Sequence, residues 1–344
     1  IVKLISFADA GSDFLFTSFI PEVGYDQALI NFAFRALPVI IFFSSLIAAT
    51  YHLGVIQIII KNIAKVMEKT MKTSGAETLS ISANIFVGQT EAPILIRPYI
   101  SKMTNSELMT VMVGGFSTVA GSVMALYVTW LNNIPEIAGH LLAASVMSAP
   151  AALMVAKIIY PETKSYQIIS SNSINLKSQD NNLVDAIGRG ATDGLKLAAN
   201  VAAMLIAFIS LVAMINFILS LLGTSMQEML GLLFKPLAWT MGIPWADAKI
   251  VGTLMGEKIV LTELIAFRDL SDYVSNNTIS ERSVIIASYA LCGFANFGSI
   301  GIQLGGIGSM APKRKKDLSK LVFKAMLGGA IASWLTASIV GILI

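Results

Sequence analysis

The chain gathers its apolar residues into long stretches and most of its charged residues into short segments between them. Six stretches contain no Asp, Glu, Lys or Arg: residues 36–60, 108–135, 137–156, 197–227, 283–312 and 325–344. Each reaches or exceeds the roughly 20 residues with which a helix crosses about 30 Å of hydrocarbon. One such stretch is compatible with a buried helix, but six together predict a polytopic α-helical membrane protein.

Two further apolar stretches, residues 79–96 and 250–267, differ from this pattern because they carry acids. Glu91 lies in the first, and the second contains Glu257, Lys258 and Glu263. A carboxylate at the centre of a bilayer costs about 2.5–3.5 kcal/mol on insertion scales, so each of these stretches needs a reason to be there. We interpret both as re-entrant hairpins. The alternative is a plain spanning helix whose carboxylate is paired.

Each acidic stretch is followed by a span that glycine and small polar residues interrupt. The interruptions are residues 114–122 (GGFSTVAGS) after the first stretch and residues 293–301 (GFANFGSIG) after the second. The same order, an acidic stretch and then a broken helix, therefore occurs twice. Paired interruptions of this kind indicate an internal repeat with a binding site near the bilayer midplane.

The turn of the first hairpin is expected at the sequence GQTEAP. Gly88 permits a turn, and Pro93 fits the first turn of a returning helix. Gln89, Thr90 and Glu91 then lie at a helix N-terminus, where free N–H groups and the helix dipole favour a carboxylate. The functional interpretation of Glu91 is an acceptor for substrate hydrogens, and the structural alternative is an ion pair with a nearby basic residue.

Asn84 lies one turn before Gly88 on the incoming arm of the same hairpin. A side-chain carbonyl, hydroxyl groups and unwound backbone carbonyls form the hard-oxygen site that a small cation needs. Ser117 and Thr118, in the first interrupted span, are candidates for the remaining oxygens. The alternative for Asn84 is a hydrogen bond that packs two helices together.

In the second interrupted span, Phe294, Asn296 and Ser299 place an aromatic ring, an amide and a hydroxyl within six residues. This combination suits a flat polar ligand with a ring and a sugar-like part. The alternative is ordinary polar contact between helices, which is common where small residues allow close approach.

Composition agrees with a membrane protein and excludes several function classes. The chain is 55% hydrophobic and 13% charged, whereas a soluble domain has about 25% charged residues. A net charge of +3 is too small to indicate nucleic-acid binding. The sequence contains no HExxH motif, nucleophile elbow or phosphate loop, so an enzyme is not expected, and we expect no cofactor.

The pattern predicts an arrangement of segments along the chain. Basic residues are densest at 313–324, which by the positive-inside rule predicts a cytoplasmic loop there. The expected segments are an interfacial region (1–35), a scaffold transmembrane helix (36–60), the first hairpin with its broken helix (74–135), a scaffold helix with a polar loop (136–182), an amphipathic lead-in with a long transmembrane helix (183–228), the second hairpin with its broken helix (229–312), and a basic loop with the last scaffold helix (313–344).

Taken together, these segments resemble the concentrative nucleoside transporters. The resemblance covers essentially the whole chain in order, and GQTEAP and GFANFGSIG are its specific motifs. It rests on residues 83–100, 114–125, 197–216, 262–267 and 290–308. Members of this family normally have additional transmembrane helices before the point where this sequence starts, so we expect the sequence to be part of a longer protein.

The resemblance implies a homotrimer in the inner (cytoplasmic) membrane, each protomer having a scaffold domain and a transport domain with two opposed re-entrant hairpins. It also implies sodium-driven import of nucleosides such as uridine by an elevator movement. The residues that it assigns to the nucleobase are Gln89, Thr90 and Glu91, with Val123 lining the pocket. Those that it assigns to the ribose are Glu263, Asn296 and Ser299, with Phe294 beside them. Those that it assigns to sodium are Asn84, Val87, Thr118 and Val119.

Two alternatives stay open from the sequence. The proton-coupled branch of the family typically lacks the asparagine and reads GQSE, so Asn84 and GQTE favour sodium as the coupling ion. A hairpin-containing transporter of another small polar solute is the second alternative. An anionic substrate is disfavoured because Glu91 and Glu263 would repel it. The lipid bilayer and the other protomers are the expected partners, and nucleic acid is not.

Overall fold

The computed structural model describes residues 7, 8, 11, 12, 15, 37–163, 174, 176 and 180–344. Most of the expected interfacial region 1–35 and much of the polar loop after residue 160 lie outside the described residues. Within the described part all regular structure is helical, as the sequence predicts. The helices are α2 (Leu37–His52), α3 (Val55–Met71), α4 (Gly75–Asn84), α5 (Glu91–Ile94), α6 (Arg97–Ile100), α7 (Asn105–Ser117), α8 (Gly121–Trp130), α9 (Ile137–Ile159), α10 (Leu183–Ser220), α11 (Met226–Thr240), α12 (Ala248–Val260), α13 (Glu263–Ser275), α14 (Glu281–Leu291), α15 (Phe297–Met310), the 3₁₀ turn η4 (Pro312–Arg314) and α16 (Lys315–Leu343).

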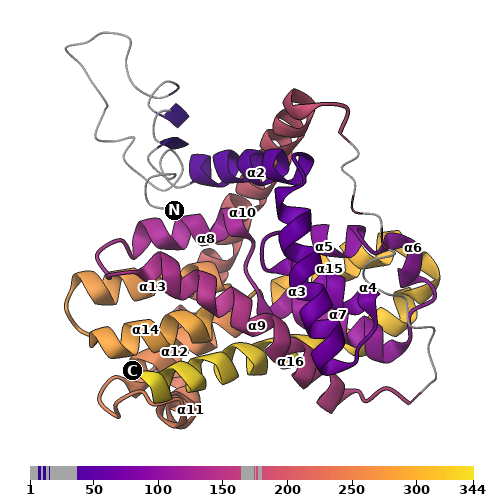
Figure 1. The fold of residues 1–344 in the computed structure, drawn as a ribbon. Helices are drawn as coiled ribbons and strands as arrows, with labels where there is room; N and C mark the ends of the chain where they lie inside the picture. The colour runs from indigo at the N-terminus through magenta and orange to yellow at the C-terminus, as the bar shows by residue number, and fades with distance from the viewer. Residues whose placement is uncertain are drawn as a thin grey trace.

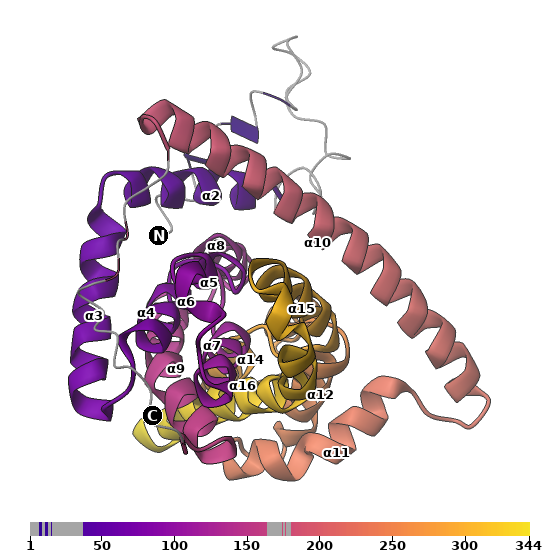
Figure 2. The ribbon, with the colours of Figure 1, turned by 90° about the vertical axis from the view of Figure 1, so that its right-hand side faces the viewer.

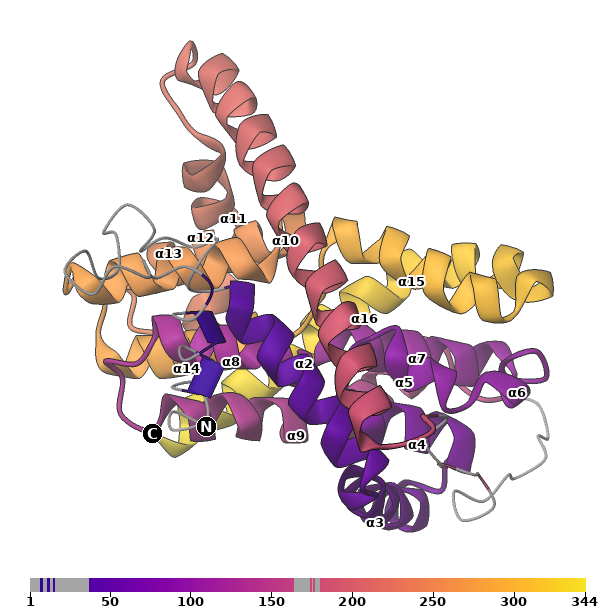
Figure 3. The ribbon, with the colours of Figure 1, turned by 90° about the horizontal axis from the view of Figure 1, so that it is seen from above.

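An inner bundle and an outer frame make up the molecule. Figure 2 shows α2, α3, α10 and α11 running around the outside of a bundle formed by α4 to α9 and α12 to α16. Within the frame α2 packs along α10, and α11 packs on α12 of the bundle. In the bundle α16 packs against both α7 and α9 (Figure 1). Seen from above, α13 and α15 extend to opposite sides of the centre (Figure 3).

Among the described residues, three helical segments are long and apolar enough to cross a membrane: Asn105–Trp130, Ile137–Ile159 and Pro312–Leu343. A fourth results if α2 and α3 count as one bent span. The apolar stretch 283–312 is divided between α14 and α15, and the stretch 197–227 forms much of the 38-residue helix α10. These lengths support the prediction of a membrane protein.

The stretch 36–60 is not the single straight helix that its composition suggests. Helix α2 ends at His52, Gly54 takes a φ of +83°, and α3 leaves at an angle of 76° to α2. A φ in this range favours glycine, because a β-carbon there is strained. Helix α3 also carries lysines among its apolar residues, and Ile58 and Val66 are exposed along it. An amphipathic helix of this kind suits the edge of a bilayer better than its centre.

Both breaks predicted in the spans are present, and they meet. Helices α7 and α8 are separated by Thr118–Ala120, and α14 and α15 by residues 292–296. Gly293 has a φ of +121°, and a β-carbon on it would lie 2.7 Å from the carbonyl oxygen of Phe116. The end of α7 and the start of the second break therefore touch through their backbones, at a point where only glycine fits.

Candidate functional site

The first hairpin turns between Asn84, the last residue of α4, and Glu91, the first residue of α5. Thr90 is the N-cap of α5 and Pro93 its third residue, as the sequence predicts for a returning helix. At Gly88 there is a close contact that the sequence does not reveal. Its φ is not positive, but the Glu91 carboxylate lies so close that a β-carbon at this position would collide with it.

Gln89 is buried at this turn and held by two residues of α15. Its side-chain nitrogen donates a hydrogen bond to Ser299 Oγ at 3.2 Å. Its side-chain oxygen accepts one from Gln303 Nε2 at 3.1 Å. Gln303 Nε2 also donates to the carbonyl oxygen of Met112 on α7 at 3.1 Å. The tip of the first hairpin is thus fixed to both broken helices.

Glu263 occupies the corresponding place in the second hairpin, as the first residue of α13. Thr262 caps this helix by accepting a hydrogen bond from the backbone nitrogen of Ile265. The carboxylate is buried and accepts hydrogen bonds from Tyr127 Oη at 3.1 Å and from Asn296 Nδ2 at 2.8 Å. Because a carboxylate has about four acceptor positions, it retains capacity for further donors.

Asn296 connects the two hairpins. Its side-chain nitrogen donates to Glu263 of the second hairpin, and its side-chain oxygen caps α15, whose Ser299 binds Gln89 of the first hairpin. The backbone nitrogen of Ser299 donates to Asn296 Oδ1 at 2.7 Å. One continuous chain of hydrogen bonds therefore runs from Gln89 through Ser299 and Asn296 to Glu263. All four residues are expected at the site from the sequence. We call this series of hydrogen-bonded residues, Gln89, Ser299, Asn296 and Glu263, the tip network.

The other four expected substrate residues lie outside this series of hydrogen bonds, in different surroundings. Thr90 packs on α15, since a β-carbon at Gly306 would lie 2.8 Å from Thr90 Cγ2. The Glu91 side chain is exposed. The remaining two are Val123, which is buried in the bundle core on α8, and Phe294, which is half-buried against that core.

Two residues that the sequence interpretation missed are hydrogen-bonded to the tip network. Tyr127 is fully buried, and its ring stacks on Phe267 with centroids 4.0 Å apart while its hydroxyl reaches Glu263. Gln303 lies four residues after Ser299, which places both side chains on one face of α15. That spacing was visible in the sequence, whereas Tyr127 lies in an apolar run where a tyrosine is not conspicuous.

The residues expected to hold sodium come from two adjoining segments. In the amide orientation that satisfies both ends, Asn84 donates to the carbonyl of Gly88 at 3.1 Å and accepts from the backbone nitrogen of Gly115 at 3.2 Å. Thr118 is buried, and its hydroxyl donates to the Gly114 carbonyl at 3.1 Å. The turn after α4 is joined to the break by a hydrogen bond from Gly121 N to Phe86 O. Val87 follows Phe86 in this turn, and Val119 is buried within the break.

This arrangement suits a monovalent cation that is bound by uncharged oxygen atoms. Among the described residues no group of three or more His, Cys, Asp and Glu side chains is placed to hold a metal ion. The carbonyl, amide and hydroxyl oxygens around Asn84 and Thr118 are hard ligands of the type that a sodium ion prefers.

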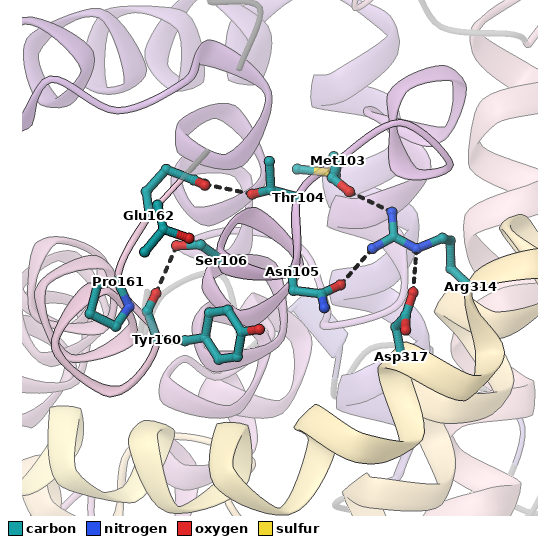
Figure 4. A pocket seen from close by; sticks show the side chains of 10 residues that line it. Met103, Thr104, Asn105, Ser106, Tyr160, Pro161, Glu162, Arg314 and Asp317 are labelled. Carbon is teal, nitrogen blue, oxygen red and sulfur yellow. Dashed lines mark hydrogen bonds and ion pairs between the residues drawn. The ribbon is translucent and has the colours of Figure 1, made fainter. Parts of the chain in front are cut away.

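A separate polar cavity of about 420 Å³ lies near the start of α7, at the opposite end of that helix from Gly115 (Figure 4). Arg314 there donates to Asp317 Oδ2 at 2.8 Å, to Asn105 Oδ1 at 2.7 Å and to the backbone carbonyl of Met103. Thr104 binds Glu162. These polar groups bind one another and tie the ends of α7, α9 and α16 together, which indicates a structural role.

Two family models match the chain. Residues 140–341 match the one described as the C-terminus of Na⁺-dependent nucleoside transporters, and residues 33–133 match the one described as nucleoside recognition. Sodium/nucleoside cotransporter 1 of Rattus norvegicus is 43% identical over an alignment 363 positions long, which covers 98% of this chain and 54% of the rat protein. The chain therefore spans about half the length of that relative.

A bacterial protein and a solved structure are equally similar. An uncharacterized transporter of Bacillus subtilis, YutK, is 42% identical, with 99% of this chain and 84% of that protein covered. The structure described as CNTnw in an inward-facing substrate-bound state is 42% identical and has a TM-score of 0.89. The match covers 99% of this chain and 82% of that one.

Proposed function

Because this chain belongs to the family of Na⁺-dependent nucleoside transporters, we propose that it imports nucleosides across the cytoplasmic membrane together with sodium. The observation that carries the proposal is the tip network, which joins Gln89 of the first hairpin to Glu263 of the second. It links amide, hydroxyl and carboxylate groups from both halves of the repeat through one series of hydrogen bonds. A small neutral ligand with hydrogen-bonding groups at both ends fits such a site.

The chemistry of each end suits one part of a nucleoside. The Glu263 carboxylate can accept both hydrogens of the vicinal ribose diol, with Asn296 and Ser299 supplying further polar contacts. At the other end Gln89 offers an amide that donates and accepts, the pattern needed to bind the polar edge of a base. Thr90, Glu91 and Val123 complete the base side, and Phe294 offers an aromatic face beside the ribose.

Sodium is assigned to the junction between the first hairpin and the first break. The proposed ligands are the side chains of Asn84 and Thr118 and the backbone carbonyls of Val87, Thr118 and Val119. The same turn that presents Val87 also presents Gln89, so binding the ion would order the turn before the nucleoside arrives. This link gives coupling a physical basis, since each ligand then favours the state that the other binds.

The driving force is adequate for accumulation. One sodium ion moving through 100 mV gains about 2.3 kcal/mol, and a tenfold concentration gradient adds about 1.4 kcal/mol. The sum of roughly 3.7 kcal/mol corresponds to a solute concentration ratio of a few hundredfold.

The movement proposed is an elevator in which the inner bundle carries the ligands past the frame. Helices α9 and α16 pack against α7, so we count them with the moving bundle rather than with the scaffold to which the sequence interpretation assigned them. The frame of α2, α3, α10 and α11 is then the fixed part. We also propose that both hairpins are re-entrant and that the complete protein is a homotrimer.

Uptake of labelled uridine into proteoliposomes tests the function directly. The complete protein should accumulate uridine above equilibrium when sodium is high outside, and the accumulation should collapse when the gradient is dissipated. Equal uptake in choline medium with an imposed proton gradient would show that protons, not sodium ions, are the coupling ion. Uptake that never exceeds equilibrium under either gradient would refute a concentrating carrier.

A further inference from the structure

Lys258 is a fully buried lysine of α12, five residues before Glu263. Its ammonium group donates to the carbonyl oxygen of Ala290 at 2.9 Å and to that of Cys292 at 3.4 Å. Burying a charge is costly unless hydrogen bonds and opposite charge compensate it. This ammonium is therefore held at its position for a reason beyond packing.

The two carbonyls belong to the end of α14, where the helix stops at the second break. The last carbonyls of a helix carry partial negative charge, which a cation stabilises. Ser333 of α16 donates to the same Cys292 carbonyl at 2.5 Å, so this carbonyl accepts hydrogen bonds from two side chains. The charge of Lys258 lies near enough to Glu263 to favour its ionised form, although no salt bridge joins the two side chains.

The acid next to it in the sequence does not neutralise this ammonium. Glu257 interacts instead with Gln227 and Asp269, and these three residues line a separate cavity of about 210 Å³. The buried acid of the first hairpin arm, Glu77, has its own partner in Lys157, with 2.8 Å between Oε2 and Nζ. The charge on Lys258 is thus available to the helix end and to Glu263.

The first repeat has a buried polar group in the corresponding place. Asn84 lies in the last turn of the hairpin arm α4 and reaches the backbone of Gly115, near the end of α7. Lys258 lies in the last turn of the hairpin arm α12 and reaches the end of α14. The two helix ends meet through Gly293. In the first repeat the side chain at this place is a neutral amide, Asn84, which lies beside the Gly88 carbonyl. In the second repeat it is a cation, Lys258, which binds the carbonyls of Ala290 and Cys292.

We propose that Lys258 is a built-in cation that takes, in the second repeat, the place that sodium takes in the first, so that one coupling sodium accompanies each nucleoside. The proposal rests on the proposed function. With Glu91 and Glu263 ionised, Lys258 leaves the site with a net charge of −1, and a single sodium ion makes it neutral. A carrier that holds the nucleoside without sodium then bears an unbalanced charge through the bilayer, which opposes movement of the nucleoside without the ion.

Counting bound sodium tests this role. Lys258→Ser removes the charge, frees space between the two carbonyls and adds a hydroxyl ligand. With uridine present, the wild-type protein should bind about one ²²Na⁺ per chain and this variant about two, with a correspondingly steeper sodium dependence of uridine binding. A folded Lys258→Ser protein that binds one sodium ion with unchanged sodium dependence would overturn the proposal.

Two further variants settle the matter if Lys258→Ser does not fold. Lys258→Arg keeps the charge and should transport with about one charge moved per uridine, while Lys258→Met fills the space without charge and should lose accumulation. The proposal fails if the Met variant moves one charge per uridine, or if the Arg variant fails as the Met variant does. Wild-type uptake that ignores sodium would refute the proposed function instead, and is measured first.

Discussion

Gln303 donates a hydrogen bond from its side-chain nitrogen to the side-chain oxygen of Gln89 at 3.1 Å, joining α15 to the tip of the first hairpin. The same nitrogen reaches the carbonyl of Met112, so α7, α15 and the hairpin tip share one donor. Gln89 can present its amide to a ligand in only one orientation while Gln303 donates to its oxygen. Gln303 therefore positions Gln89.

Replacing Gln303 by Leu should weaken uridine binding by about tenfold, because Gln89 loses the donor that orients it and a lost buried hydrogen bond costs about 1–1.5 kcal/mol. The measurement is the KM for uridine in proteoliposomes and the Kd for the purified protein. Ser309→Ala is the control, since Ser309 is exposed on the same helix and bonds only within it, to Gly306. Equal affinity of the Gln303→Leu and Ser309→Ala proteins would contradict the positioning role.

Tyr127→Phe should lower uridine affinity by about tenfold, because Glu263 loses a charge-assisted hydrogen bond worth about 1.5–3 kcal/mol while the ring stacked on Phe267 is kept. If Glu263 binds the ribose, the loss should largely vanish for 2′,3′-dideoxyuridine, which lacks the diol. Tyr289→Phe, which removes a hydroxyl bonded to His140, is the control. A loss of the same size for both ligands would place the effect in folding rather than in ribose binding.

Glu263→Gln should reduce uridine affinity more strongly, by on the order of a hundredfold, since the charged acceptor for two hydroxyls disappears. Part of the effect is structural, because the amide must reorganise around Tyr127 and Asn296. Comparing uridine with its dideoxy analogue by equilibrium binding separates the two contributions. Unchanged uridine binding would remove Glu263 from the ribose site.

The polar residues of the tip network could be predicted because they interrupt apolar stretches. A carboxylate or amide in a membrane segment stands out, so Gln89, Asn296 and Glu263 were found from their surroundings alone. Tyr127 was not, since a tyrosine is compatible with an apolar helix, and only the fold shows that its hydroxyl meets an acid 136 residues away.

The larger arrangement depended on long-range packing that the sequence pattern does not contain. The repeat of an acidic stretch and a broken helix predicted both breaks, but not that they touch at Gly293. The sharp bend after α2 depends on one glycine, Gly54, within a stretch that is uniformly apolar. Lys258 was visible as a charge in the second hairpin, yet nothing local shows that its ammonium caps α14.

Gly293→Ala should destabilise the protein by about 1–3 kcal/mol, because the residue has a positive φ and a methyl group would press on the Phe116 and Ser117 backbone. Thermal unfolding in detergent, followed by size-exclusion chromatography, measures the effect. Gly301→Ala on α15 is the matched control, since a β-carbon there meets nothing within 4 Å. If both variants unfold at the wild-type temperature, the two breaks do not pack as described.

Asn84→Ala should raise the sodium concentration for half-maximal uridine uptake by at least about tenfold, since it removes one proposed ligand and both bonds that shape the turn. Ser80→Ala is the matched control on the same helix, one turn earlier. The Ser80 hydroxyl is buried without a hydrogen-bond partner, so its loss should leave the sodium dependence unchanged. Uridine binding measured at saturating sodium separates a damaged ion site from a damaged substrate site, because only the former is restored by more sodium. If the Asn84→Ala protein has the same sodium dependence as Ser80→Ala, sodium does not bind at this junction, and the proposed coupling between the turn and Gln89 is wrong.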